Sequence, residues 1–272
     1  MTVGAEKQAS DAAWEFRTRH HLGVQPLGDL VELIERTTCA DVAVLDPDDG
    51  EHGLTMRDPV GGAVFIGIAR SRNPMRQRST LGHELGHLIF EDWANETEYG
   101  ARSPEEIRAD AFARHLLIPV VGVREFLGEG RPATETDLSA LVQRFRVSPQ
   151  IAAIALYDGG YIDEDTKATW MRCSTPQLAT RHGWTDHYAS LQDDSDRLRA
   201  PQSLVARAVT GYAEGVVTAQ TLATLRGVPL ETMLAELDAA GVRPSQLEPA
   251  DTEELPDLDV DLSDLEDEGA SS

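Results

Sequence analysis

Two histidines four residues apart constrain this chain more than any other feature of its sequence. They lie in the run Ser79-Thr80-Leu81-Gly82-His83-Glu84-Leu85-Gly86-His87, which carries leucines at helical spacing and continues to Phe90 without a proline. On an α-helix, residues four apart share one face, with their Cβ atoms about 5–6 Å apart. The imidazole rings of His83 and His87 can then reach one metal ion, so the spacing predicts a metal site on a helix.

Glu84 follows the first histidine and lies about 100° round the helix from it. This offset holds the carboxylate out of the metal's ligand shell but close to a bound water. Zinc lowers the pKa of such a water from about 15.7 to about 7, and a neighbouring carboxylate can take its proton and pass it to a leaving amine. The order His-Glu-x-x-His thus predicts Glu84 as the catalytic base of a peptide hydrolase. Because the pattern alone is only moderately specific, the alternative is a solvated helix face that carries two histidines.

A catalytic zinc site needs a third protein ligand. Trp93 stands ten residues after His83, where one large class of metalloproteases has its third histidine. The acids available further on are Glu91, Asp92, Glu96, Glu98, Glu105, Glu106 and Asp110. The loop acids lack a rigid support, whereas Glu106 and Asp110 are one turn apart on the next predicted helix, which begins at Ser103-Pro104. Glu106 is either the third ligand, with Asp110 behind a histidine, or half of a capping box with Ser103.

The residues before the histidine segment predict an α+β fold. Residues 29–38 show helical spacing, and two short apolar runs follow, Val42–Leu45 and Ala63–Ile68, separated by turn sequences. We expect a small antiparallel sheet packed on the active-site helices within a metallopeptidase domain of residues 1–128. The run Ala63–Ile68 is either an interior strand or a sheet edge to which an extended substrate adds.

The rest of the chain predicts a helical domain and a tail. Residues 129–245 contain helix-turn-helix-like pairs at 137–161 and 204–237, and the first pair has few basic residues, which favours substrate positioning or packing over DNA binding. Residues 246–272 predict an acidic, disordered tail, because ten acids and no base lie between Asp251 and Glu268. The leucines of the tail also fall at regular spacing, so a docking or inhibitory segment is the alternative.

The composition of the chain limits the classes of function that it can have. The chain has 272 residues, 41% of them hydrophobic, and a formal charge of −23, which argues against non-specific binding to nucleic acid or anionic membranes. It has no apolar run long enough to span a bilayer and no signal-peptide layout at its start, so we expect a cytoplasmic protein that does not engage a membrane. Cys39 and Cys173 are expected to be reduced thiols.

Three further features have open interpretations. The cluster Arg70, Arg72, Arg76 and Arg78 is either a solvated loop and helix start or a grip for an acidic segment. Tyr99 and His115 are weak candidates for stabilising the oxyanion that forms when water attacks a carbonyl.

The runs Arg76–His87, Glu106–Ala113 and Leu116–Pro119 resemble the ImmA/IrrE family of metallopeptidases. The resemblance spans Leu30–Pro119 and extends to the helix pair at 137–161. It implies a zincin-type domain in which His83, His87 and Glu106 bind the metal and Glu84 is the base. Zinc suits this ligand set best, and manganese or iron is also accepted. The chain departs from the family pattern at Ser79, where an aromatic residue is usual, and at Asp110, where asparagine is usual.

Known members of that family cut helix-turn-helix repressors and so relieve repression. The resemblance therefore implies a zinc-dependent endopeptidase whose partner is a protein substrate, a helix-turn-helix transcriptional repressor, cut by limited proteolysis. The alternative is a non-proteolytic regulator that binds a repressor or DNA through its helical domain.

Overall fold

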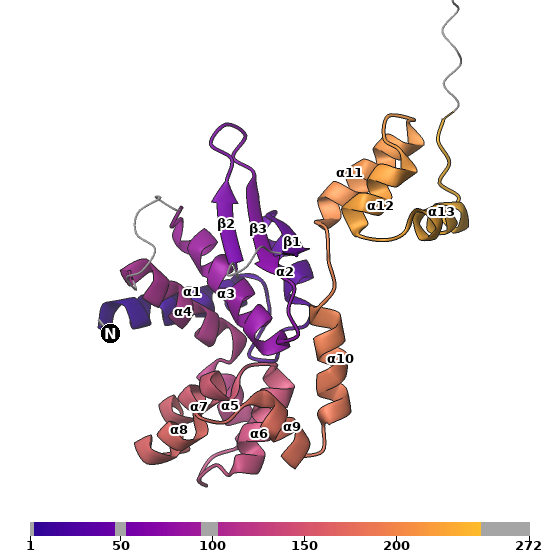
Figure 1. Ribbon diagram of the computed structural model, residues 1–272. Helices are drawn as coiled ribbons and strands as arrows, with labels where there is room; N and C mark the ends of the chain where they lie inside the picture. Colours follow the sequence, from indigo (N-terminus) through magenta and orange to yellow (C-terminus); the bar gives the residue numbers. More distant parts are fainter. Residues whose placement is uncertain (1–2, 47–52, 94–102, 246–272) are drawn as a thin grey trace, which may run out of the picture.

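The computed structural model describes residues 3–46, 53–93 and 103–245 of the chain (Figure 1). Its elements are, in order, α1 (Val3–Arg19), α2 (Leu30–Thr38), β1 (Asp41–Leu45), β2 (Gly53–Arg57), β3 (Val64–Ala69), α3 (Pro74–Phe90), α4 (Pro104–Leu117), α5 (Val120–Leu127), α6 (Glu135–Phe145), α7 (Pro149–Asp158), α8 (Glu164–Trp170), α9 (Thr175–Arg181), α10 (Thr185–Ser195), α11 (Gln202–Ala213), α12 (Ala219–Arg226) and α13 (Leu230–Ala239). The predicted α+β class is confirmed. None of the described helices combines the length and apolar character needed to cross a membrane.

The three strands form one mixed sheet in the order β1-β3-β2. β2 pairs antiparallel with β3, as predicted, whereas β1 pairs parallel with β3, so the expectation of a wholly antiparallel sheet is wrong. The cause is the apolar character of β3, whose Ile66 and Ile68 are buried. Such a strand takes the central position, where both of its faces are covered. The chain therefore crosses from β1 to the far side of the sheet before it returns through β3.

The central place of β3 confirms one of the two interpretations of Ala63–Ile68, that of an interior strand. Ala63–Ile68 is not the edge to which a substrate strand can add, because β3 is paired on both sides. The outer edge of β1 is partly covered by the segment before α11, through two backbone hydrogen bonds between Val44 and Arg199. Among the described residues, β2 is the strand whose outer edge has no ladder partner.

One large apolar core joins the sheet to most of the helices. It contains buried residues from α1 through α10, from Ala9 to Tyr188, and so runs across the predicted domain boundary at residue 128. Helices α11–α13 have a small separate core of Leu222, Ala223, Met233 and Leu237. Figure 1 shows these three helices set apart from the other elements. The division into residues 1–128, 129–245 and 246–272 stays a prediction, and the last of these segments lies outside the described residues.

Two buried arginines hold the loop between α1 and α2. Arg17 donates to the carbonyl oxygens of Leu116, Gly23 and Gln25, and Arg78 donates to those of Leu27 and Gly28. Burial lowers the pKa of each guanidinium to about 10, so both remain charged at neutral pH. The loop is thus tied to α3 and α4, the two helices that carry the candidate site.

Candidate metal centre and active site

The helix α3 places the histidine pair. Asn73 caps its start by accepting a hydrogen bond from the backbone N–H of Arg76, and Pro74 occupies the first helical position, where its missing N–H has no cost. Thr80 therefore lies inside the helix. Leu81 and Leu85 are buried in the core, which leaves His83 and His87 together on another face.

Two glycines of α3, Gly82 and Gly86, let α4 approach closely. A Cβ atom on Gly82 would lie 3.1 Å from the Ala113 side chain, and one on Gly86 would lie 3.1 Å from the Cα of Ala109. Both distances are shorter than ordinary van der Waals contacts, so a methyl group at either position would push against α4. Because Ala109 and Ala113 are one turn apart on α4, the contact fixes both the distance and the register of the two helices.

This register brings the carboxylate of Glu106 to the histidines. Ser103 caps α4 by accepting a hydrogen bond from the Glu106 backbone N–H, at 3.3 Å. The side chain of Glu106 meanwhile lies against both imidazole rings, with oxygens 3.2 Å from Nε2 of His83 and 3.4 Å from Nε2 of His87. The position of this side chain agrees with the interpretation of Glu106 as a metal ligand rather than as half of a capping box.

The three side chains can be tested as a ligand set. Nε2 of His83 and Nε2 of His87 are 3.0 Å apart, and one ligand atom from each of the three residues lies within 4.8 Å of the others. Bonds of about 2.1 Å at tetrahedral angles would separate ligand atoms by about 3.4 Å. The two Nε2 atoms are about that far apart, and each lies within 3.4 Å of one or the other oxygen of the Glu106 carboxylate, so two imidazoles and a carboxylate are placed to surround one metal ion. That they bind one stays a prediction.

The first histidine is held by an acid behind it. Nδ1 of His83 lies 3.0 Å from Oδ1 of Asp110, one turn after Glu106 on α4. Burial lowers the pKa of His83, but the Asp110 hydrogen bond and the charges of Glu84, Asp110 and Glu106 outweigh it, so the net pKa is raised. With Nδ1 directed at Asp110, the lone pair of Nε2 is directed at the ligand set.

Glu84 is almost fully buried, with 6% of its surface exposed. The hydroxyl of Thr55, on β2, donates to Oε2 of Glu84 at 2.6 Å. A Cβ atom on Gly53, two residues earlier, would overlap Oε1 of Glu84 and lie 2.6 Å from the Thr80 methyl. On β2, Thr55 therefore holds one oxygen of the Glu84 carboxylate by a hydrogen bond, and the absence of a side chain at Gly53 leaves room for the other oxygen.

Thr55 and Gly53 were not predicted as site residues from the sequence. The sequence signal that could have pointed to Thr55 was the alternation of apolar and polar residues in Leu54-Thr55-Met56. In the structure Thr55 is buried, whereas Leu54 and Met56 each have about half of their surface exposed. Asp92 was set aside as an unsupported loop acid. In the structure the carboxylate of Asp92 is 13% exposed and bonded by Arg108 at 2.6 Å.

The other candidate residues of the site either contact other parts of the protein or lie outside the described residues. His115 is nine residues, or two and a half turns, after Glu106 and so lies on the opposite face of α4. Its Nε2 contacts Glu6 of α1 at 2.7 Å, which assigns it to helix packing rather than to an oxyanion. Tyr99 lies outside the described residues, as do Glu96 and Glu98.

The arginine cluster does not form one patch. Arg70 pairs with Asp46 in a bidentate contact of 3.0 Å, Arg72 pairs with Asp193 near α10, and Arg78 is buried. Three of the four arginines thus serve internal contacts. This favours the interpretation of a loop and helix start over that of a grip for an acidic segment.

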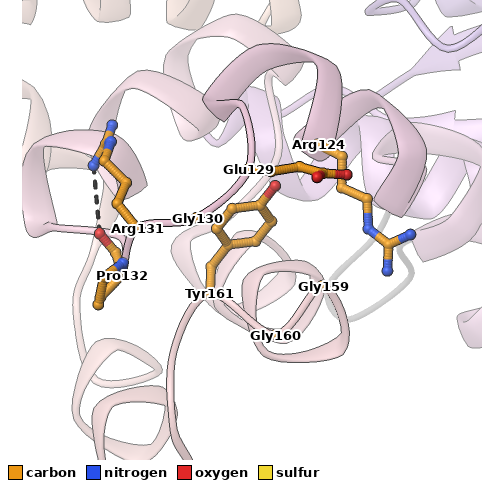
Figure 2. Close-up of a pocket in the computed structure, with 8 residues that line it drawn as sticks. All are labelled: Arg124, Glu129, Gly130, Arg131, Pro132, Gly159, Gly160 and Tyr161. Carbon is orange, nitrogen blue, oxygen red and sulfur yellow. Dashed lines mark hydrogen bonds between the residues drawn. The ribbon is translucent and has the colours of Figure 1, made fainter.

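A hollow of about 420 Å³ has other lining residues. Figure 2 shows Tyr161 between Arg124 and Arg131, with Gly159 and Gly160 beside it. The hydroxyl of Tyr161 donates to the carbonyl of Gly128 at 2.9 Å, and Arg131 is bidentate to Asp137 at 2.7 Å. Since its lining contains none of the three candidate ligands and not Glu84, this hollow is separate from the candidate active site.

A helix with His-Glu-x-x-His beside a small sheet, and a glutamate from the next helix, define a metallopeptidase domain of the zincin type. The family model of peptidase M78, the IrrE N-terminal-like domain, matches residues 38–157. This match supports the resemblance to the ImmA/IrrE family found in the sequence. The match crosses residue 128, as the buried core does. No curated protein sequence matches the chain.

Proposed function

We propose that this protein is a cytoplasmic zinc-dependent endopeptidase that cuts a regulatory protein, a helix-turn-helix transcriptional repressor, by limited proteolysis. The observation that carries the proposal is the convergence of His83, His87 and Glu106 on one point beside the buried carboxylate of Glu84. When bound there, zinc acidifies water and polarises a carbonyl oxygen. The repressor as substrate rests on the family alone, whose known members act on such proteins.

Glu84 is the proposed base. Its carboxylate accepts the proton of the attacking water and returns it to the amine nitrogen as the peptide bond breaks. Thr55 donates to Oε2, so Oε1, which lies beside Gly53, is the oxygen proposed to take the proton. The hydroxyl of Thr55 thus reduces the number of orientations that the carboxylate can adopt before reaction.

The outer edge of β2 is the proposed site for the substrate backbone. An extended peptide adds to an open strand edge through backbone hydrogen bonds. β2 is suited to this because it also holds Glu84, so a peptide paired with β2 runs past the base. The side chains of Leu54 and Met56 are about half exposed on the sheet face opposite Thr55. This strand replaces Ala63–Ile68 as the predicted docking edge.

The helical region is proposed to position the substrate or to pack, and not to read DNA. In a helix-turn-helix motif the second helix must be free to enter the major groove. In the pair α6–α7, the second helix buries Ala152, Ala153, Ala155 and Leu156. Gln150, near its start, donates to the carbonyls of Met171 and Cys173 and is therefore covered by the segment after α8.

The direct test is to incubate the zinc-loaded protein with a repressor encoded beside it and to read the fragments by mass. We expect one or a few defined cuts, lost on addition of a chelator and restored by zinc. The variant Glu84→Gln should bind zinc as the wild type does and cut at least about 100-fold more slowly, because the base is lost.

The same variant separates the proposal from its alternative. A regulator that acts by holding a repressor or DNA would not need the carboxylate of Glu84. If Glu84→Gln still relieves repression in cells, the protein works by binding and the proteolytic proposal is wrong.

A further inference from the structure

Within the described residues, one nitrogen of the second histidine of the site has no hydrogen-bond partner. Nδ1 of His87 is buried and makes no hydrogen bond within the described part of the chain, and the same holds for Oδ2 of Asp92. These two atoms lie 3.8 Å apart and face each other. A buried polar atom left without a partner costs about 1–3 kcal/mol, so two such atoms side by side call for an explanation.

The chemistry of the ligand set supplies one. Both Nε2 atoms are directed at the candidate metal position, so each ring must carry its proton on Nδ1 and needs an acceptor there. Asp110 fills this role for His83, at 3.0 Å. Asp92 occupies the corresponding place behind His87.

Asp92 is held in that place by both helices of the site. Glu91 ends α3 in the left-handed conformation, with φ of 56°, and this turn lets the backbone N–H of Asp92 donate to the carbonyl of His87 at 2.9 Å. From α4, Arg108 donates to Oδ1 of Asp92 at 2.6 Å. The guanidinium of Arg108 lies over the ring of Phe90, 4.2 Å from its centroid, so the arginine is itself constrained.

We propose that Asp92 is a positioning residue of the metal centre, which accepts the Nδ1–H of His87 while Arg108 holds its other oxygen. A hydrogen bond needs about 3.0 Å, so the proposal requires Nδ1 of His87 and Oδ2 of Asp92 to approach each other from 3.8 Å when the metal is bound. The two histidine ligands then have equivalent supports, Asp110 from within α4 and Asp92 from the end of α3. This inference rests on the proposed metal site and adds to it two residues, Asp92 and Arg108.

Zinc affinity tests the proposal without any substrate. The dissociation constant for zinc is measured by competition with a chromophoric chelator. The proteins compared are the wild type, Asp92→Ala and Arg108→Met. Asp193→Ala is the matched control, because it removes an exposed aspartate of α10. Loss of an acceptor behind a ligand histidine typically weakens metal binding about 10–100-fold. We expect that loss for Asp92→Ala, a smaller one for Arg108→Met, and none for the control. Wild-type affinity in Asp92→Ala overturns the proposal.

Nuclear magnetic resonance of the wild type gives a second readout, which holds even if Asp92→Ala does not fold. With ¹⁵N-labelled histidine and bound zinc, we expect a slowly exchanging Nδ1–H signal from His87, assigned by its absence in His87→Gln. A rapidly exchanging Nδ1–H, or a proton on Nε2 instead, contradicts the proposal. A wild type that binds no zinc overturns the proposed function as well, whereas zinc binding unaffected by Asp92→Ala overturns this inference alone.

Discussion

Thr55 donates a hydrogen bond of 2.6 Å to Oε2 of Glu84 and a longer one of 3.3 Å to the backbone carbonyl of the same residue. The strand that lies at the open edge of the sheet is therefore bonded to the residue proposed as the base. The hydroxyl of Thr55 thus links the strand β2 to the proposed base on α3.

Replacement of Thr55 by valine keeps the shape of the side chain and removes the donor. A hydrogen bond to a charged group contributes about 1.5–3 kcal/mol, so we expect kcat/KM for the repressor to fall at least about tenfold in Thr55→Val. Thr55→Ser should retain most of the activity, and zinc affinity should be the same in all three proteins. Equal rates for the valine variant and the wild type would show that the hydroxyl does not orient Glu84.

Gly53→Ala should damage activity more than stability. The new methyl group would overlap Oε1 of Glu84 and lie 2.6 Å from the Thr80 methyl, so both side chains must shift. A shift of the base by about 1 Å can lower the rate about 100-fold. We expect a loss of that order in kcat/KM with a modest fall in the melting temperature. A parallel loss of both would instead indicate a disrupted strand.

Gly86→Ala tests the close approach of α3 and α4. Alanine favours the helix by about 1 kcal/mol, but its methyl would lie 3.1 Å from the Cα of Ala109, and overpacking of this kind costs about 1–3 kcal/mol. We expect a net loss of about 1 kcal/mol in unfolding free energy and weaker zinc binding, because Glu106 moves with α4.

Gly4→Ala is the matched control for that change. Gly4 lies in α1, and a Cβ atom there would meet nothing within 4 Å. We expect this variant to be as stable as the wild type or slightly more stable, with the same zinc affinity. If Gly86→Ala behaves like Gly4→Ala, the contact between the two helices does not require glycine.

The contact of α1 with α4 should depend on pH. Burial raises the pKa of Glu6, but hydrogen bonds from Arg114 and His115 outweigh it, so the pKa is lowered from its usual 4.5. Asp158 faces Arg114 from the far side at 3.8 Å. A lowered pKa means that ionised Glu6 stabilises the fold above pH 4.5 and that this contribution is lost as pH falls below it.

Urea unfolding of Glu6→Gln checks this sign. After allowance for solvent screening, we expect the variant to be about 1 kcal/mol less stable than the wild type at pH 7. The difference should persist to about pH 5 and disappear as the pH falls below 4.5. A difference that grows toward acid pH would contradict the assignment.

The parts of the site that could be predicted from the sequence are those whose geometry depends on residues close together in the chain. The spacing of His83 and His87 fixes their relation on any helix, and Gly82 and Gly86, each directly before one of them, leave room for a close neighbour. Glu106 was left open by spacing and implied by the family resemblance, and the structure brings it to both rings.

The parts that sequence reasoning missed depend on contacts between distant segments. Nothing near Thr55 in the chain indicates that its hydroxyl meets a residue of α3. Asp92 seemed unsupported because its support, Arg108, comes from the next helix, sixteen residues later. The parallel pairing of β1 was missed for the same reason, since strand order depends on which strand is covered on both faces and not on the turn sequences.

The bridge between Val44 and Arg199 has a consequence for growth of the sheet. By pairing with Val44, the segment before α11 covers part of the outer edge of β1. Within the described residues, β2 is therefore the more open side for a further strand. A strand added on that side would lie next to the strand that holds the carboxylate of Glu84.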